Sequence, residues 1–334
     1  MKATWVTRVG ARSPQGMSAL QVAMSARTGA LAPSATPFLD QHGERIGMSR
    51  ARAIPDEVVG AARLIRLAVP ALAEVVVGSE GPLTLSLALP DRDRPGQTAE
   101  LAGLVLAGLA VALGRPLDPR SSLVRAGHAG GALALEAAVR LAAEGAPNVI
   151  VGGVDSYFDA ESLRWLDEGD RLHSSQADDG FIPGEGAAFA ALGAADSRSL
   201  PQRPLARLIA VESAVEPTWG ADLPNVGQAL TGVVRRLLTA AGGEVRWVIN
   251  DCSGEQHRER EWYRAALRAE EMLQAPVRTD PSRLGGDLGA ATGLLGLAVA
   301  CTWWSAGCAP SSRCLVSLAS DGAERGGFVV EEAP

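Results

Sequence analysis

The chain has 334 residues, 47% of them hydrophobic and 21% charged, a composition typical of a globular protein with room for one large domain or two fused halves. Its 31 basic and 38 acidic residues give a formal net charge of −7. Lys and Arg form no cluster along the chain, so nucleic acid is excluded as an expected partner. The four cysteines form no CxxC pair, which argues against a zinc site.

Short apolar runs with strand character alternate with longer helical stretches along the chain. Residues 149–154 (VIVGGV) are apolar throughout, as in a strand that is covered on both faces. This alternation predicts an α/β fold with mainly parallel strands. In chain order, strands are predicted at residues 4–9, 83–89, 149–154, 187–192, 205–211, 245–249 and 314–319, and helices at residues 18–28, 55–74, 99–113, 130–144, 226–241, 258–273 and 289–305.

One uncharged stretch of nineteen residues, 289–307, is about as long as a membrane-spanning helix. Gly, Ala, Thr, Cys and Ser dilute its hydrophobicity and no cluster of Lys or Arg flanks it, so we predict a buried helix and no membrane span. Residues 101–113 are predicted to form a second buried helix. The N-terminal MKATWVTRVG lacks the apolar core of a secretion signal, so the expected location is the cytoplasm.

The alternation of strands and helices begins again after about residue 200. Segments rich in Pro and Gly, such as RPGQ, GRPLDPR and PQRPL, indicate loops rather than a long linker. We therefore predict two pseudo-equivalent halves in one compact unit, residues 1–200 and residues 201–334, although no residue-level repeat is visible.

The stretch RAGHAGGALALEA, residues 125–137, has the pattern of a strand end, a Gly-rich turn and the start of an apolar helix. Such a turn presents one side chain at a helix N-terminus, where free N–H groups and the helix dipole favour negative charge. A Cys or Ser nucleophile is activated in such a place, whereas this chain has His128. The turn is therefore the first candidate site.

Five glycine-containing segments occur along the chain: residues 9–29 (VGARSPQGMSALQVAMSARTG), 127–154 (GHAGGALALEAAVRLAAEGAPNVIVGGV), 180–188 (GFIPGEGAA), 285–293 (GGDLGAATG) and 322–334 (GAERGGFVVEEAP). Taken in this order, they resemble segments of the β-ketoacyl synthases, a family of the thiolase-fold superfamily. The resemblance implies a thiolase-like layered fold (α-β-α-β-α) of two pseudo-equivalent halves with mainly parallel sheets.

Carried over residue by residue, the resemblance places the three catalytic positions of the family on other residue types. The Cys that takes the acyl group falls on His128, the first His on Asp251 and the second His on Gly286, while residues 321–323 (DGA) replace a Phe-Gly-Gly gate. Imidazole cannot form the stable thioester, Asp251 brings negative charge where an oxyanion must be stabilised, and Gly286 supplies no donor. Since such groups act as a unit, the resemblance implies that condensing activity is lost.

The first interpretation is a non-catalytic ketosynthase-like protein that acts through its surface as a scaffold, adaptor or chaperone. Thiolase folds dimerise by pairing strands next to the elbow helix, so the strand before Ala126 is expected to form a homodimer, or a heterodimer with another protein. Residues 11–16 (ARSPQG) and 38–48 (FLDQHGERIGM) are also similar to small thiolase-like proteins encoded beside type VI secretion genes. That similarity implies an accessory role in loading a secreted effector.

Two other interpretations remain open at this point. In one, the site is remodelled into an acyl-thioester hydrolase or acyltransferase, with Cys252 or Ser253 as nucleophile, His128 as base and Asp251 orienting it. In the other, the chain binds an acyl carrier protein or coenzyme A without chemistry. Simpler structural roles compete with the remodelled site, because His128 also fits a hydrogen-bonded core residue and residues 251–253 a capped loop. None of these interpretations calls for a metal or a resident cofactor.

The remaining polar and aromatic features are expected to be structural. Residues 257–261 (HRERE) predict a solvated helix start, and His173 is expected at the surface. Glu185, in the segment PGEGAA, is expected in a structural turn, and Trp303 and Trp304 are expected to pack in the core.

Overall fold

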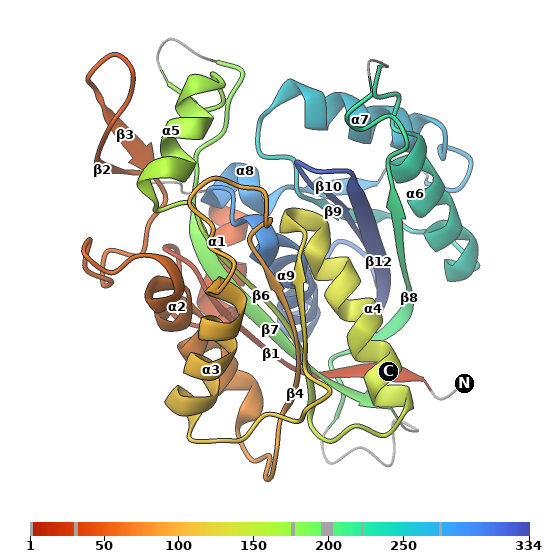
Figure 1. Ribbon diagram of the computed structural model, residues 1–334. Helices are drawn as coiled ribbons and strands as arrows, with labels where there is room; N and C mark the ends of the chain where they lie inside the picture. Colours follow the sequence, from red (N-terminus) through yellow and green to blue (C-terminus); the bar gives the residue numbers. More distant parts are fainter. Residues whose placement is uncertain (1–2, 30–32, 175–177, 195–202, 222–223, 274–275) are drawn as a thin grey trace.

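A computed structural model describes residues 3–29, 33–174, 178–194, 203–221, 224–273 and 276–334. The strands of its main sheet are β1 Thr4–Arg12, β4 Thr84–Leu89, β5 Ser122–Arg125, β6 Val149–Ser156, β7 Glu185–Ala194, β8 Ala206–Val215, β9 Trp247–Asn250, β10 Val277–Thr279, β11 Arg313–Ala319 and β12 Glu324–Glu332. They form one ten-stranded sheet in the order β10-β9-β11-β12-β8-β1-β7-β6-β4-β5 (Figure 1).

The sheet consists of two groups of five strands with the same internal order. One group is β5-β4-β6-β7-β1 and the other is β10-β9-β11-β12-β8, so each strand has a counterpart in the other group. In each group the three outer strands are parallel and the inner ones are antiparallel. The groups meet where residues 4–6 of β1 pair with residues 206–208 of β8. The predicted boundary at residue 200 lies outside the described residues and stays a prediction.

Helices cover the sheet and fill the space between its two groups (Figure 1). Their bounds are α1 Ala19–Thr28, α2 Gly60–Val76, α3 Leu101–Leu113, α4 Gly130–Ala143, α5 Ala160–Glu168, α6 Gln228–Ala241, α7 Gln256–Leu267, α8 Pro281–Gly285 and α9 Thr292–Ser305. Helices α4 and α9 lie in the middle, because each packs against strands of both groups. Helices α2 and α3 cover one outer face, and α6 and α7 cover the other. The predicted α-β-α-β-α layering is confirmed.

The central elements are apolar because both of their faces are covered. Every residue of β4 and β6 is buried, as is every residue of α9 from Thr292 to Trp304. This burial explains why the stretch 289–307 carries no charge, and the prediction of a buried helix there is confirmed. None of the helices in the described ranges is both long and apolar enough to cross a membrane.

Helices α4 and α9 cross at a pair of glycines in their first turns. A Cβ on Gly131 would lie 3.3 Å from the Cα of Gly293, and a Cβ on Gly293 would lie 3.5 Å from the Cα of Gly131. Only residues without a side chain allow so close an approach. The contact therefore holds the N-termini of the two central helices side by side.

Helix α3 is less buried than the sequence predicts. Its buried residues recur every fourth position, at Leu101, Val105 and Leu109, whereas Leu104 and Val111 are 57% and 82% exposed. The prediction of a buried helix is therefore wrong here, because only one stripe of α3 packs inward. The helix is apolar on all sides, so its sequence has no periodicity that separates the covered face from the open one.

The sequence does not predict several shorter elements. β2 (Ser34–Leu39) and β3 (Arg45–Met48) form a separate hairpin that lies near α5 (Figure 1). This hairpin contains most of the segment 38–48 that resembles proteins of type VI secretion clusters. Strands β5, β10 and β12 and helices α5 and α8 are further elements without a prediction.

Candidate functional site

The candidate site is the turn between β5 and α4. Gly127 has φ +55°, in the left-handed region that favours glycine, and the short 3₁₀ turn Gly127–Ala129 leads directly into α4. The His128 side chain in this turn is almost completely buried. The Ala129 N–H donates to Ser320 Oγ over 2.9 Å, which ties the turn to the loop that follows β11.

Asp287 binds the imidazole of His128. Its two carboxylate oxygens lie 2.8 and 2.9 Å from His128 Nε2, and Oδ1 also accepts the Gly289 N–H over 2.7 Å. Burial disfavours the charged imidazole, but the attraction of Asp287 outweighs it and raises the pKa of His128 above its usual value. Burial also acts against the charged carboxylate, yet His128 and Arg258 lower the pKa of Asp287. Both shifts favour a buried ion pair.

Arg258 lies on the other side of the imidazole. Its Nη2 is 3.4 Å from His128 Nδ1, and the same guanidinium bonds Asp251 and Asp321. In the neutral ring Nε2–H donates to Asp287 and Nδ1 accepts from Arg258, while the charged ring has no free lone pair. In neither state does His128 have a free lone pair with which to act as a general base.

The two positions that align with catalytic His residues have structural roles. Asp251 is buried and its Oδ2 accepts the Ala319 N–H over 2.7 Å. Burial raises the pKa of the Asp251 carboxyl. Gly286 has φ +85°, and a Cβ there would lie only 2.6 Å from Ser49 Cβ. Position 286 therefore has no room for an imidazole in this conformation.

The structure does not bring Cys252 or Ser253 to His128. Cys252 packs in the apolar cluster under α6 and α7, with Leu230 and Trp262 among its members. Burial raises the pKa of the Cys252 thiol well above its usual value, so the reactive thiolate is disfavoured. Ser253 lines a separate, smaller cavity. Among the hydrogen bonds of the described residues, none joins either side chain to His128.

The HRERE segment at the start of α7 is not the solvated turn that the sequence predicts. Arg258 and Glu261 are 3% and 4% exposed, although the neighbouring His257 is at the surface. Arg258 faces the carboxylates of Asp251 and Asp321, and Glu261 binds Arg325 over 2.6 Å. The prediction is wrong for Arg258 and Glu261 because partners from distant strands neutralise them.

Sequence reasoning missed Asp287 and Arg258, the two partners of His128. Asp287 directly follows Gly286, the position that aligns with the second catalytic His, and it precedes a helix start. A carboxylate at a helix N-terminus is a recognisable pattern, so this residue had a signal in the sequence. Arg258 had only a weak one: its partner Glu255 lies three residues earlier, whereas Asp321 and His128 come from distant parts of the chain.

A cavity of about 590 Å³ opens at the elbow and includes His128 in its lining. Two arginines in this lining are only partly satisfied. Arg94 binds Asp155 over 2.5 Å, but its buried Nε has no hydrogen-bond partner among the described residues. Arg125 donates from Nη1 to the Thr98 carbonyl over 2.9 Å, while its buried Nε and Nη2 have no such partner. Trp165 also lines the cavity. The elbow therefore keeps an open pocket with an incompletely satisfied cation.

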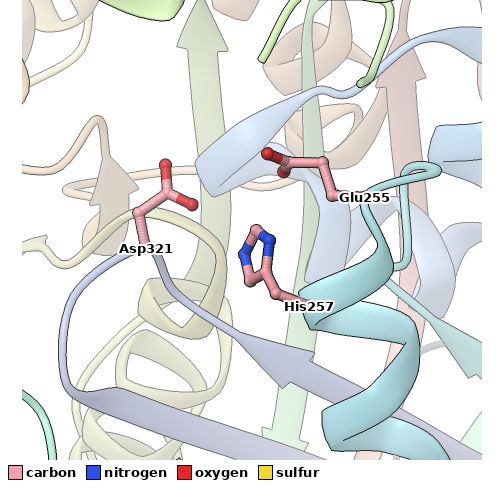
Figure 2. Close-up of side chains that lie close together, drawn as sticks. All are labelled: Glu255, His257 and Asp321. Carbon is pink, nitrogen blue, oxygen red and sulfur yellow. The ribbon is translucent and has the colours of Figure 1, made fainter. Parts of the chain in front are cut away.

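Glu255, His257 and Asp321 converge beside this cavity, as Figure 2 shows, with one potential ligand atom of each within 4.8 Å of the others. Both carboxylates are already bound by Arg171, over 2.7 and 2.9 Å to Glu255 and over 3.0 and 3.2 Å to Asp321. Burial opposes the charge of Asp321, but Arg258 and Arg171 lower the pKa of its carboxyl. Two guanidinium groups neutralise the carboxylates and repel a metal ion, so these residues form a charge network rather than a metal centre.

The residues predicted to be structural are placed as follows. Glu185 is the first residue of β7 rather than part of the predicted turn, and it is fully buried and binds Arg63 over 2.6 and 2.7 Å. The Trp303 ring stacks on Trp247 with 5.4 Å between the ring centres. His173 is exposed. Each of these placements agrees with a structural role.

No family model matches the chain, and no curated protein matches it. Solved structures do match over 99–100% of the chain. One is the ishigamide ketosynthase/chain length factor, with 18% identity, a TM-score of 0.75 and all of that chain covered. Another is AntDE:AntF, a type II PKS acyl-carrier protein in complex with its ketosynthase bound to the hexaketide, with 13% identity, a TM-score of 0.78 and all of the matched chain covered.

A third match is the ketosynthase from module 6 of the bacillaene synthase of Bacillus subtilis 168, with 14% identity, a TM-score of 0.79 and 72% of that chain covered. At these identities the likeness shows the fold alone. This chain therefore has the thiolase-like fold of the ketosynthases.

Proposed function

We propose that this chain is a non-catalytic ketosynthase-like protein that acts as a dimeric scaffold or adaptor. The observation that carries the proposal is the pairing of His128 with Asp287 at the position of the family's nucleophile. A Claisen condensation needs a thiolate to hold the acyl group and cationic or neutral donors for the enolate. At the elbow the imidazole has no free lone pair, and Asp287 and Asp251 supply negative charge instead of donors.

Support for a dimer comes from the edge of the sheet and the helix beside it. β5 lies at one end of the strand order, next to the elbow. Helix α3 carries no charge, and it exposes Leu104 and Val111. An exposed apolar helix face next to a sheet edge is typical of a protein–protein interface. We propose that β5 and α3 pair with a second copy or with a related chain; one structural neighbour is a ketosynthase/chain length factor.

The loss of condensation is tested with purified protein, a short acyl thioester and a malonyl thioester. We expect no Claisen product by mass spectrometry and no stable acyl adduct on the intact protein. A thiol probe such as iodoacetamide is expected to leave Cys252 unlabelled until the protein is unfolded, because this thiol is buried and its pKa is raised. A Claisen product would overturn the proposal. Turnover of the acyl thioester, or an adduct, that disappears in both Cys252→Ala and His128→Ala variants would instead establish the remodelled hydrolase or acyltransferase.

The dimer is tested by light scattering on the wild-type protein and on a Leu104→Glu, Val111→Glu variant. The variant is expected to be monomeric, because two carboxylates cannot be buried in an apolar interface without a large cost. Leu267→Glu is a matched control, since Leu267 is 55% exposed on α7 in the other half of the molecule. A wild-type protein that is monomeric at all concentrations would exclude the homodimer.

The partner is tested by gentle purification of the tagged protein from its native host. A scaffold should bring a stoichiometric protein partner with it, and a secreted effector or a related thiolase-fold chain would identify the role. The effector proposal rests on the sequence similarity of residues 11–16 and 38–48. Recovery of a free homodimer alone, with every preparation, would count against the adaptor role.

A second candidate function is binding of an acyl carrier protein or coenzyme A without chemistry. The cavity at the elbow and the unsatisfied Nε and Nη2 of Arg125 favour it, because both ligands carry a phosphate that such a cation would bind. One neighbour, AntDE:AntF, is a ketosynthase in complex with an acyl-carrier protein. Coenzyme A is expected to raise the melting temperature of the wild-type protein and not that of Arg125→Gln; no shift with coenzyme A or with carrier protein would rule this function out.

A further inference from the structure

A second, smaller cavity lies apart from the elbow. Its volume is about 230 Å³, and it is lined by the segment after α5, the loop after β9 and helix α8. It shares no lining residue with the cavity at His128. The two cavities are therefore formed by different residues.

Two hydroxyl groups in this cavity lack the partner that buried polar groups normally have. Ser253 and Ser282 are 6% and 3% exposed, and the Oγ atom of each is buried with no hydrogen bond to any described residue. Buried polar side-chain atoms in folded proteins are nearly always hydrogen-bonded. The two orphaned hydroxyls come from separate segments, and both serines line the same cavity.

The lining of this cavity also includes a cation. Arg283 lines it and a neighbouring cavity bordered by Arg278 and Asp280, its side chain is 62% exposed, and its one described ion pair is with Glu259 at 3.9 Å. Both oxygens of Glu259 are already bound by Arg278, over 2.8 Å each. The guanidinium of Arg283 therefore keeps most of its donors for another acceptor.

We propose that this cavity binds a small oxyanion, a carboxylate or phosphate group, through the hydroxyls of Ser253 and Ser282 and the guanidinium of Arg283. Hydroxyl and guanidinium donors converging on one acceptor are the usual recognition elements for such groups. His173 is a further potential donor at this cavity. Asp178 lines the cavity too, and its negative charge disfavours a large polyanion there.

The test is calorimetric titration of the full-length protein with inorganic phosphate and, separately, with acetate, at a constant ionic strength set by chloride. We expect saturable binding of at least one probe, weakened about tenfold or more in Arg283→Gln. Arg235→Gln is the matched control, because Arg235 is also exposed, on helix α6. The two probes separate a carboxylate site from a phosphate site.

The hydroxyls are tested with a Ser253→Ala, Ser282→Ala variant and a readout of stability. Removing an unsatisfied buried hydroxyl does not destabilise the ligand-free protein, so its melting temperature should stay the same or rise while binding is lost. No saturable binding of either probe would overturn the proposal. It would equally be overturned by binding that survives unchanged in both Arg283→Gln and the double variant.

Discussion

The two central helices begin in the same way and serve different purposes. Each starts with a glycine of positive φ, Gly127 at +55° and Gly289 at +50°, followed by one 3₁₀ turn. At the start of α4 the next residue is His128, which meets charged side chains on both sides. At the start of α9 the next residue is Ala290, whose side chain is packed in the main apolar core.

The difference shows that a helix start of this design does not by itself make an active site. The free N–H groups of α9 are bound by carboxylates, since Gly289 N–H donates to Asp287 and Ala290 N–H donates to Asp155. Asp287 therefore serves both helices, capping one and pairing with the histidine at the start of the other. What distinguishes the two helix starts is the residue after the glycine and the charges that other segments bring to it.

The largest expected effect comes from removing the residue that the two helix starts share. Asp287→Ala leaves His128 without its carboxylate and the Gly289 N–H without its acceptor. Loss of one partner from a buried pair costs about 3–5 kcal/mol, and this loss should appear as a reduced free energy of unfolding in urea. Asp287→Asn retains the acceptor for Gly289 and is the control. Equal stability of wild type and Asp287→Ala would show that the pair contributes nothing.

A second experiment compares the two glycines directly. An L-residue in the left-handed region costs about 1–2 kcal/mol at either position. At Gly289, however, a Cβ would lie 2.1 Å from Asp155 Oδ2, whereas at Gly127 its nearest neighbour would be 3.7 Å away. Gly289→Ala should therefore cost about 1–3 kcal/mol more than Gly127→Ala. Equal losses of unfolding free energy in the two variants would mean that an added Cβ is tolerated equally well at the starts of α9 and α4.

The raised pKa of His128 at the start of α4 predicts that the stability of the protein depends on pH. The folded-state pKa of His128 is raised above the usual 6.5, so its contribution to stability is complete below that pH and is lost as the pH rises through the folded value. Titration of the His128 imidazole changes the free energy of unfolding by at most about 1.4 kcal/mol per pH unit. Asp287, with a lowered pKa, adds stability that is lost as the pH falls below its usual 3.8.

Unfolding free energies measured from pH 5 to pH 9 check this prediction, with His128→Gln as the comparison. Partial desolvation lowers the pKa of His257, which lies at the surface, and its titration acts in the opposite sense, so both proteins should carry His257→Gln. The negative slope above pH 6.5 should then be present with His128 and absent without it. The same slope in both proteins would exclude an ion pair at the elbow.

The smallest effect is expected at the hydroxyl that caps α4. Ser320→Ala removes the acceptor for the Ala129 N–H, a loss of about 1 kcal/mol in the free energy of unfolding. Ser311, a half-buried serine in the loop before β11, is a control position at which Ala should be nearly neutral apart from one weak turn contact. A larger loss at Ser311 than at Ser320 would show that the hydroxyl does not cap the turn.

The layering and most long elements follow from local patterns. Residues 149–154 and 289–305 are apolar because both faces are covered, so the sequence identifies them and their burial. Local hydrophobicity does not predict the burial of helix α3. This helix is as apolar as α9, yet its Leu104 and Val111 are exposed. An exposed apolar face and a buried one have the same local sequence, and only the neighbours decide between them.

The residues of the candidate site also differ in whether the local sequence predicts their role. His128 could be identified from its turn, since a glycine-rich strand-to-helix junction is a local feature. Its partner Arg258 could not, because a run of alternating charges predicts a solvated helix unless distant carboxylates meet it. Cys252 and Ser253 follow Asp251 in sequence but have different surroundings, since Cys252 packs in an apolar cluster and Ser253 lines a cavity.

The charges beside the elbow bear on any nucleophile placed there. A cysteine in place of His128 would stand between Asp287, whose negative charge opposes formation of a thiolate, and Arg258, whose positive charge favours it. Removing the aspartate would leave the cation alone beside the thiol. Because Asp287 also accepts the Gly289 N–H before α9, the change that would activate a thiol here would also cost stability.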